Sequence, residues 1–292
     1  MSDAMNMSAS RPEIYREPVA SEKFGVVEKP LSPWERLSNI PGFRKVLVLI
    51  CLAVIWELYA RHLNNSLIFP SLTETLSALG RDVVSGGLLV KTWTSIRVLL
   101  VGYSVGLVLA AILTVLAITT RIGADILETL TAMFNPLPAI ALLPLALIWF
   151  GLGEGSLVFV LVHSVLWAVT LNTHSGFLNV SLTLRMVGRN YGLKGFSYVC
   201  RILIPAAFAS ILSGMKIGWA FAWRTLIAAE LVFGVSSGSG GLGWFIYLNK
   251  NMLDIPSVFA GLLMVILIGL FVENLIFRVI EKFTVQRWGM QV

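Results

Sequence analysis

Residues 98–118 form a run of 21 consecutive residues without one charged side chain. A helix of about 20 apolar residues is as long as the hydrocarbon core of a bilayer is thick. Only 13% of the 292 residues are charged and 57% are hydrophobic, whereas about 25% of the residues in a typical soluble domain are charged. Because one aqueous core cannot bury so many apolar side chains, the sequence predicts a membrane protein.

Six segments are long and apolar enough to span a membrane, and we therefore predict an all-α, polytopic fold. These are residues 43–60, 98–118, 129–150, 156–178, 202–233 and 257–277. The third segment contains Pro136, Pro138 and Pro144, and prolines are tolerated in spans where neighbouring groups satisfy the freed carbonyls. We expect this span to be broken. Residues 1–42 mix charged residues, serine and proline, and are expected to form a mostly disordered cytoplasmic leader.

Lysine and arginine are unevenly distributed between the segments that connect these spans. Seven lie in residues 1–45, four between spans four and five, and three in the tail after span six. On the opposite side there are four in residues 61–97, none in 151–155 and one in 234–256. Cytoplasmic loops carry the excess of positive charge, so we predict that both termini are inside the cell. The net charge of +6 then follows from topology, and nucleic acid is not an expected partner.

The first outer segment contains a predicted helix of its own. Ser71 and Glu74 have the spacing of a capping box, and apolar residues follow at helical intervals. The pattern predicts a short amphipathic helix at the outer membrane surface.

A short basic segment with several glycines separates the fourth and fifth apolar runs. Gly192 is followed by nine residues and then by Ile202-Leu203-Ile204-Pro205. This pattern resembles the cytoplasmic loop of binding-protein-dependent ABC transporter permeases, in which a glycine, nine residues and an I-x-L-P-like element follow an EAA triplet. Other stretches resemble the nitrate/sulfonate/taurine branch of that family, over roughly residues 43–290. They are NPLPAIALLPLALIWFGLG (135–153), LNTHSG (171–176), WRTLIAAELV (223–232), SGGLGWFIY (239–247) and RWGM (287–290).

The resemblance implies the ABC type I importer permease fold, with a cytoplasmic coupling segment at residues 180–201. In the family this segment forms short helices that dock in a cleft of the ATPase. The residues that would carry this role are Arg185, Gly188, Arg189, Gly192, Leu193, Lys194, Gly195 and Phe196. The EAA position here reads Met186-Val187-Gly188, so the usual acidic residue is absent. An ordinary, positively charged cytoplasmic loop is the alternative interpretation.

The resemblance also implies a complex of two such permeases, two cytoplasmic ATP-binding subunits and a periplasmic solute-binding protein in the bacterial inner membrane. The imported solute would be a small anion, such as taurine or another sulfonate, nitrate, bicarbonate or an aromatic carboxylate. The sequence has no G-x-x-x-x-G-K-[ST] motif, so the partner would bind ATP. We expect this chain to be non-catalytic and without a cofactor.

Two other classes of membrane protein remain as alternatives. An ion-gradient-driven secondary transporter would favour inverted repeats and carboxylates near the midplane. No convincing repeat is found, and Glu230 is the one deeply placed acid of the predicted spans. A membrane scaffold that only anchors a partner is the other alternative.

Five residues of the fifth span lie at intervals of three or four, which places them on one helix face. They are Lys216, Trp219, Trp223, Ile227 and Glu230. Ionisable groups in a span face a cavity or pair with one another, so we hypothesise that this stripe lines the translocation path at a dimer interface. The structural alternative is that Lys216 reaches toward the membrane surface and polar groups of neighbouring spans satisfy Glu230.

Other motifs do not predict chemistry. The stretch GSGGLG (238–243) fits a dinucleotide-binding pattern but follows no strand, and is expected to be an outer loop. His163 and His174 are about 16 Å apart along one helix, too far to share a metal ion, and Cys51 and Cys200 are expected to be free thiols. The pairs Gly102/Gly106 and Gly214/Gly218 predict close packing of helices.

Overall fold

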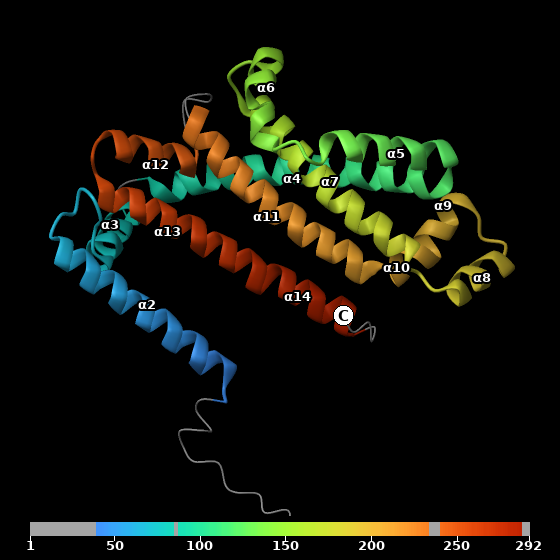
Figure 1. Ribbon diagram of the computed structural model, residues 1–292, viewed down its shortest axis with the longest axis horizontal. Coiled ribbons are helices and arrows are strands. Elements are labelled where there is room, and N and C mark those ends of the chain that lie inside the picture. Colours follow the sequence, from blue (N-terminus) through green and yellow to red (C-terminus); the bar gives the residue numbers. More distant parts are fainter. Residues whose placement is uncertain (1–38, 85–86, 234–239, 288–292) are drawn as a thin grey trace, which may run out of the picture. The chain divides into compact units, whose positions relative to one another are not determined.

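The computed structural model describes residues 39–84, 87–233 and 240–287, and the regular structure within these residues is helical. The described residues divide into two units between Leu52 and Ala53, and helix α2 (Pro41–Leu63) crosses this boundary. The predicted leader lies almost entirely outside the described residues. The helices that follow are α3 (Leu72–Val84), α4 (Leu88–Thr119), α5 (Arg121–Phe134), α6 (Leu143–Phe150), α7 (Glu154–Leu178), α8 (Leu182–Asn190), α9 (Gly195–Tyr198), α10 (Ile204–Ala206), α11 (Phe208–Phe233), α12 (Leu242–Asn251), α13 (Ile255–Phe271) and α14 (Arg278–Glu281) (Figure 1).

Short turns of other helical types connect some of these elements. A 3-10 turn, η1 (Ala139–Leu142), precedes α6. Wider, π-type turns join α9 to α10 (η2, Val199–Leu203) and α13 to α14 (η3, Val272–Phe277), and a third follows α14 (η4, Lys282–Gln286).

Among the described residues, four helical segments are long and apolar enough to cross a membrane, and the number rises to six if each of two bent pairs counts as one span. The four are Gly42–Leu63, Leu88–Thr119, Glu154–Leu178 and Ile255–Gln286. The bent pairs are Arg121–Phe134 with Ala139–Phe150, and Gly195–Ala206 with Phe208–Val232. The predicted all-α membrane fold is confirmed, and each of the six predicted spans overlaps one of these six segments, the third and the fifth as bent pairs.

The third span is broken as predicted, but it begins earlier than predicted. The chain bends by 87° between α5 and the η1–α6 segment, where Pro136 and Pro138 lack the N–H groups that would continue a helix. We expected residues 129–150, whereas α5 begins at Arg121. The first turns of α5 carry Asp125 and Glu128, so a search for uncharged runs does not detect them.

The fifth span is bent where we predicted one continuous run. An angle of 80° separates Gly195–Ala206 from Phe208–Val232. Pro205 lies directly before this bend, and Ala207, between the two segments, has non-helical dihedral angles. The 202–233 run is apolar throughout this bend, so composition alone does not reveal the change of direction.

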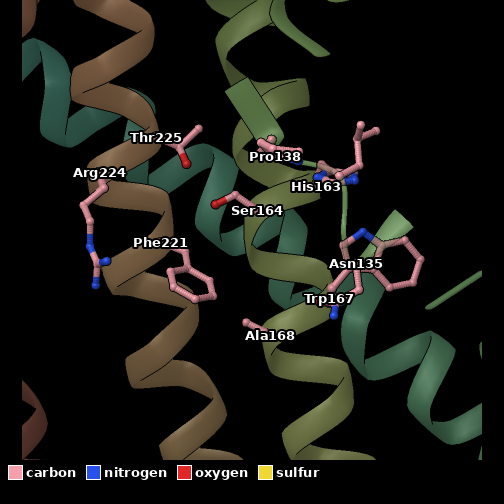
Figure 2. Close-up of a pocket in the computed structure, with 11 residues that line it drawn as sticks. Asn135, Pro138, His163, Ser164, Trp167, Ala168, Phe221, Arg224 and Thr225 are labelled. Carbon is pink, nitrogen blue, oxygen red and sulfur yellow. The ribbon is translucent and has the colours of Figure 1, made fainter. Parts of the chain in front are cut away.

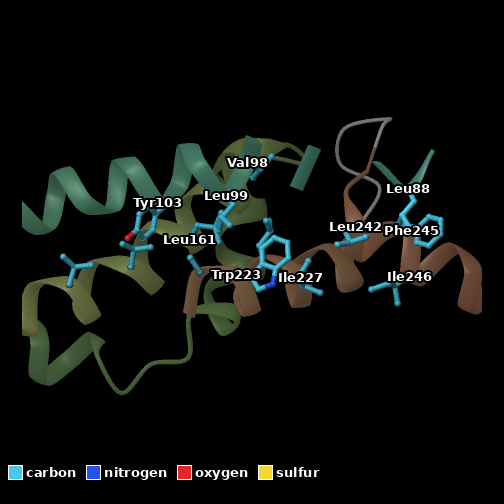
Figure 3. Close-up of a cluster of buried hydrophobic side chains, with 14 of the residues drawn as sticks. Leu88, Val98, Leu99, Tyr103, Leu161, Trp223, Ile227, Leu242, Phe245 and Ile246 are labelled. Atoms are coloured by element: carbon cyan, nitrogen blue, oxygen red, sulfur yellow. The ribbon is translucent and has the colours of Figure 1, made fainter. Parts of the chain in front are cut away.

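The core of the second unit is built around α7, which packs along both α4 and α11. Its largest cluster of buried side chains comes from α4, α7, α11 and α12, and includes Leu99, Leu161 and Leu242 (Figure 3). Glycines let the backbones approach, because a Cβ atom added at Gly106 would lie 2.7 Å from Val165 Cβ on α7. The close packing predicted from the glycine pairs is therefore found within one chain.

Helix α3 begins with the predicted capping box and braces α13. The Ser71 N–H donates to Glu74 Oε2 at 2.8 Å, and the Glu74 N–H donates to Ser71 Oγ at 3.1 Å. At the other end of α3, Arg81 Nη2 lies 3.2 Å from Asp254 Oδ2 and 2.9 Å from Ser257 Oγ, at the start of α13. This contact ties the short helix to the last span.

Candidate functional site

The segment 180–201 forms two short helices, α8 and α9, between α7 and the bent α10–α11 segment (Figure 1). Helix α8 ends at Asn190, and Gly192, two residues later, has a φ of +73°, in the left-handed region that favours glycine. The Leu193 N–H donates to the Gly188 carbonyl at 3.1 Å, as in a Schellman ending. Gly195 also has a positive φ, +52°, at the start of α9. The two glycines thus define the turn between α8 and α9.

Arg185 is directed toward its own chain. Its Nη2 atom donates to the carbonyls of Phe177 at 2.6 Å and Leu178 at 2.9 Å, and its Nε atom donates to the Val180 carbonyl at 3.0 Å. The last carbonyls of a helix have no partner within that helix, and a cation at this end also favours the helix dipole. Arg185 therefore connects α8 to the C-terminal end of α7.

Gly188 is buried where α8 approaches the following turn. A Cβ atom there would lie 2.8 Å from Ile202 Cγ1 and 2.9 Å from Tyr198 Cε2. The absence of a side chain lets α8 pack directly on these two residues. The coupling segment is thus a packed unit rather than an extended loop.

Several large side chains of this unit are exposed. Met186, Tyr191 and Phe196 are 59%, 81% and 68% exposed, and Arg189 and Lys194 of the same segment are also exposed. We call these five residues the coupling patch. Arg189, Leu193, Lys194 and Gly195 also line a cavity of about 450 Å³.

The structure divides the stripe predicted on the fifth span into two parts. Lys216, Trp219 and Trp223 line a cavity of about 290 Å³ between α11 and the last span, and the Lys216 ammonium group forms an ion pair with Glu281. Ile227 and Glu230 do not line that cavity. They are buried, with 7% and 4% of their surface exposed.

The Glu230 carboxylate connects α11 to α4 and α12. Ser95 Oγ, from α4, lies 2.7 and 2.8 Å from the two carboxylate oxygens, and the Gly243 N–H donates to Oε2 at 2.8 Å. The Leu242 N–H in turn donates to Ser95 Oγ at 2.8 Å. Neighbouring polar groups therefore satisfy Glu230. The predicted outer loop at residues 238–243 lies partly outside the described residues, and from Leu242 the chain forms α12, a helix with a buried face that we did not predict.

A further cavity, of about 240 Å³, lies between α7, α11 and the bend that precedes α6. We did not predict it from the sequence. Arg224, Ser164, Trp167 and Asn135 are among the residues that line it (Figure 2). They come from three stretches that are far apart in the chain, so no local spacing could indicate the cavity. The one available indication was an arginine within a predicted span.

The family model of the binding-protein-dependent transport system inner membrane component matches residues 102–285. The chain is similar to a putative ABC transporter permease protein of Methanocaldococcus jannaschii, with 31% identity over 242 residues, or 82% of this chain and 90% of that protein. It is 30% identical to the putative aliphatic sulfonates transport permease protein of Escherichia coli, over 67% of this chain and 70% of that protein.

The nitrate import permease protein of a Synechocystis strain is 27% identical over 242 residues, or 80% of this chain and 86% of that protein. A taurine transport system permease protein of Escherichia coli is 26% identical over 230 residues, or 77% of this chain and 82% of that protein. The match to the family model covers most of the six apolar segments and the whole coupling segment. The chain therefore belongs to the binding-protein-dependent ABC transporter permeases, as a polytopic inner-membrane protein of the nitrate/sulfonate/taurine branch.

Proposed function

We propose that this chain is the membrane-spanning subunit of an ATP-driven importer of a small anion. It works as a homodimer together with a separate cytoplasmic ATPase, which binds the ATP, and a periplasmic solute-binding protein. Permeases named for sulfonates, nitrate and taurine are its relatives, and this favours an oxyanion as the solute. The observation that carries the proposal is the coupling patch.

Met186, Arg189, Tyr191 and Lys194 of the coupling patch lie before Gly195, where the bent fifth segment begins, and Phe196 lies in the first turn of that segment. We expect these side chains to face water. Contiguous exposed apolar groups on a water-facing surface mark interaction sites. Tyrosine, phenylalanine, methionine and arginine, all present in the patch, are enriched at protein interfaces. The patch thus supports docking of a partner protein with acidic groups around an apolar cleft.

The connections of the coupling segment suggest how docking moves the spans. Arg185 holds α8 to the end of α7, and α9 continues through η2 and α10 toward α11. Because α7 and α11 pack along each other, a displacement of the coupling segment would move both helices together. ATP binding by the partner would close the ATPase dimer and switch the spans between inward and outward access, and hydrolysis would reset them.

We place the translocation path along α11. Lys216, Trp219 and Trp223 already line a cavity there, which is consistent with a polar path beside this helix. Ile227 and Glu230 continue the same helix face, and in this proposal they hold α12 at the other end of the path. Exchange of the Lys216–Glu281 ion pair during the cycle would open or close the region between α11 and the last span.

The test is mild affinity purification of the chain from its own membranes, followed by mass spectrometry. We expect a stoichiometric protein with a P-loop to co-purify. The substitution Phe196→Asp, in the coupling patch, should remove that partner. The matched control is Val84→Asp, because Val84 is 87% exposed on α3, at the opposite end of the second unit from α8 and α9 (Figure 1).

A gradient-driven carrier would behave differently. Such a chain would be recovered without an ATPase, and its uptake would be indifferent to Gly192→Trp, which places a bulky side chain where the structure has open space. Either result would contradict the proposed function.

A further inference from the structure

Two oppositely charged side chains lie in the interior of membrane-spanning segments. Arg224 is on α11, which continues to Phe233, and Glu273 is in η3 of the last span. The sequence indicated Glu230 as the one deeply placed acid because the predicted sixth span ended at residue 277, but the last helical segment continues to Gln286. Because a charged group in contact with lipid is costly, charged residues in spans face cavities or counter-charges and mark functional sites.

Arg224 and Glu273 line the same cavity, the one of about 290 Å³ between α11 and the last span. In Figure 2 the Arg224 side chain is turned away from Ser164 and Trp167, on the other side of α11, which agrees with its place in this second lining. A cation from one span and an acid from another are therefore brought to one cavity.

Neither charge is neutralised by another side chain. Lys216, the other cation of the lining, is already paired with Glu281. Within the described part of the chain, by contrast, no ion pair includes Arg224 or Glu273. The cavity therefore offers one available positive charge and one available negative charge, which are too far apart to pair directly.

Aromatic side chains fix the walls between which these charges lie. Trp223 Nε1 donates to the Val265 carbonyl at 3.2 Å and so connects α11 to α13. Trp219 packs edge-on against Tyr103 of α4 and against Phe277 of the last span, with ring centroids 5.3 and 6.5 Å apart. Both tryptophans line the cavity, so their contacts hold its shape while the two charged groups stay unpaired.

We propose that this cavity is a subsite for a small zwitterion, a solute with an oxyanion group and an ammonium group. Arg224 binds the oxyanion and Glu273 binds the ammonium group, so each charge of the cavity gains a partner. A simple anion would satisfy Arg224 but would leave Glu273 as an uncompensated, repelling charge, and such repulsion is a source of specificity. A volume of about 290 Å³ is close to the lower end of the range of ~300–1,000 Å³ typical of ligand pockets. This inference rests on the proposed function and narrows its solutes to oxyanions that also carry an ammonium group.

The test compares pairs of probes that differ in the ammonium group. Taurine and isethionate share a sulfonate group, and isethionate has a hydroxyl group in place of the ammonium group. β-Alanine and propanoate share a carboxylate, and propanoate has no ammonium group. Equilibrium dialysis with the full-length chain in lipid nanodiscs, purified with whatever partners it retains, gives the dissociation constants. We expect at least one zwitterion to bind about ten- to hundredfold more tightly than its matched anion, the range expected for a hydrogen bond between charged groups.

Substitutions then assign the two ends of the solute. Glu273→Gln should weaken binding of the zwitterion and not of the matched anion, so the preference between them disappears. Glu273→Asp keeps the carboxylate and should retain part of the preference, whereas Arg224→Gln should weaken both probes of a pair. The control Glu128→Gln removes an exposed negative charge on α5, outside the cavity, and should leave the preference unchanged.

Several results would overturn the zwitterion subsite. They are the absence of binding of all four probes, equal affinities within both pairs, and an unchanged preference in Glu273→Gln. A lower unfolding temperature of Glu273→Gln with the preference intact would show that Glu273 only stabilises the helices. Conversion of a dimer to monomers by both Glu273→Gln and Arg224→Gln would show that the two charges contact the second copy instead.

Co-purification of the ATPase is scored in the same samples, so that the subsite and the proposed function are tested separately. A complex that keeps its ATPase but shows no preference for zwitterions refutes the subsite alone. A preference that depends on Glu273, in a chain that never retains an ATPase, refutes the ATP-driven mechanism alone.

Discussion

At the scale of single residues, Arg185 closes the open end of α7 with three hydrogen bonds to backbone carbonyls. A lysine could not replace it, because a guanidinium group has donors fixed in a planar fork, whereas an ammonium group is a single point charge. The side chain is therefore a positioning residue of the coupling segment. Arg189 and Lys194, by contrast, are exposed.

We predict that Arg185→Lys and Arg185→Ala uncouple transport from ATP hydrolysis. Without the three hydrogen bonds, α8 would no longer move together with α7, so the ATPase would still bind while the uptake per ATP hydrolysed falls several-fold. Parallel measurements of uptake and ATPase activity in proteoliposomes would show this. Loss of ATPase binding in Arg185→Lys would indicate instead that Arg185 contacts the partner directly.

Glu230 gives a second prediction at this scale. Replacement by alanine leaves the Gly243 N–H and the Ser95 hydroxyl without their acceptor, so Glu230→Ala should lower the free energy of unfolding by about 3 kcal/mol. Glu230→Gln keeps one acceptor oxygen and should cost about 1 kcal/mol. Thermal unfolding of both variants in the same detergent would compare them. Equal losses would show that the charge, rather than the acceptor oxygens, stabilises the helices.

At the scale of helices, the sequence predicts which segments are helical better than it predicts where the chain bends between them. The uncharged run at residues 98–118 and the capping box at Ser71 indicate α4 and α3 directly, because length and local hydrogen bonding decide them. We did not predict the start of α5, because its first turns contain charged residues and we searched for uncharged runs. Charged residues also occur in helices that pack beside other helices. Helix α12 was missed because its stability depends on Glu230 and Ser95, which lie far from it in the sequence.

Some features of the candidate site could likewise be predicted from the sequence, and others could not. The left-handed conformation of Gly192 follows from a local motif, which a sequence can show. The cavity around Arg224 depends on how three separate stretches pack, which a sequence read without homologues does not show. Arg185 is an intermediate case. The sequence placed it in the coupling segment but did not show that it binds carbonyl groups at the end of α7.

Close helix packing leads to a prediction for Gly106. The substitution Gly106→Leu would place side-chain atoms where Val165 already lies, and overpacking of this kind typically costs about 1–3 kcal/mol. We expect a lower unfolding temperature in detergent. Gly80→Ala on α3 is the control, because nothing lies within 4 Å of a Cβ atom there and alanine is favoured over glycine in helices. A stability of Gly106→Leu equal to that of the unchanged chain would show that α4 and α7 are farther apart than described.

At the scale of the whole molecule, the predicted orientation can be tested with a native cysteine. Cys200 is exposed and lies in the coupling segment, which we expect on the cytoplasmic side. A membrane-impermeant maleimide should therefore label it in inside-out vesicles and not in right-side-out vesicles. Cys51 lies in the first span, and Cys51→Ala should leave the pattern unchanged. Labelling of Cys200 in right-side-out vesicles alone would show that the topology is opposite to the predicted one.

The hydrogen bonds of Glu230 have a consequence for how the protein is made. An acidic side chain within a membrane helix makes insertion by the translocon less favourable, and Glu230 lies three residues before the end of α11. Its acceptors are satisfied by Ser95, which is synthesised 135 residues earlier, and by Gly243, which is synthesised 13 residues later. The hydrogen bonds of Glu230 are therefore complete only when α12 has followed α11 from the ribosome and both have met α4. We expect α11 and α12 to reach their final positions beside α4 together rather than one after the other.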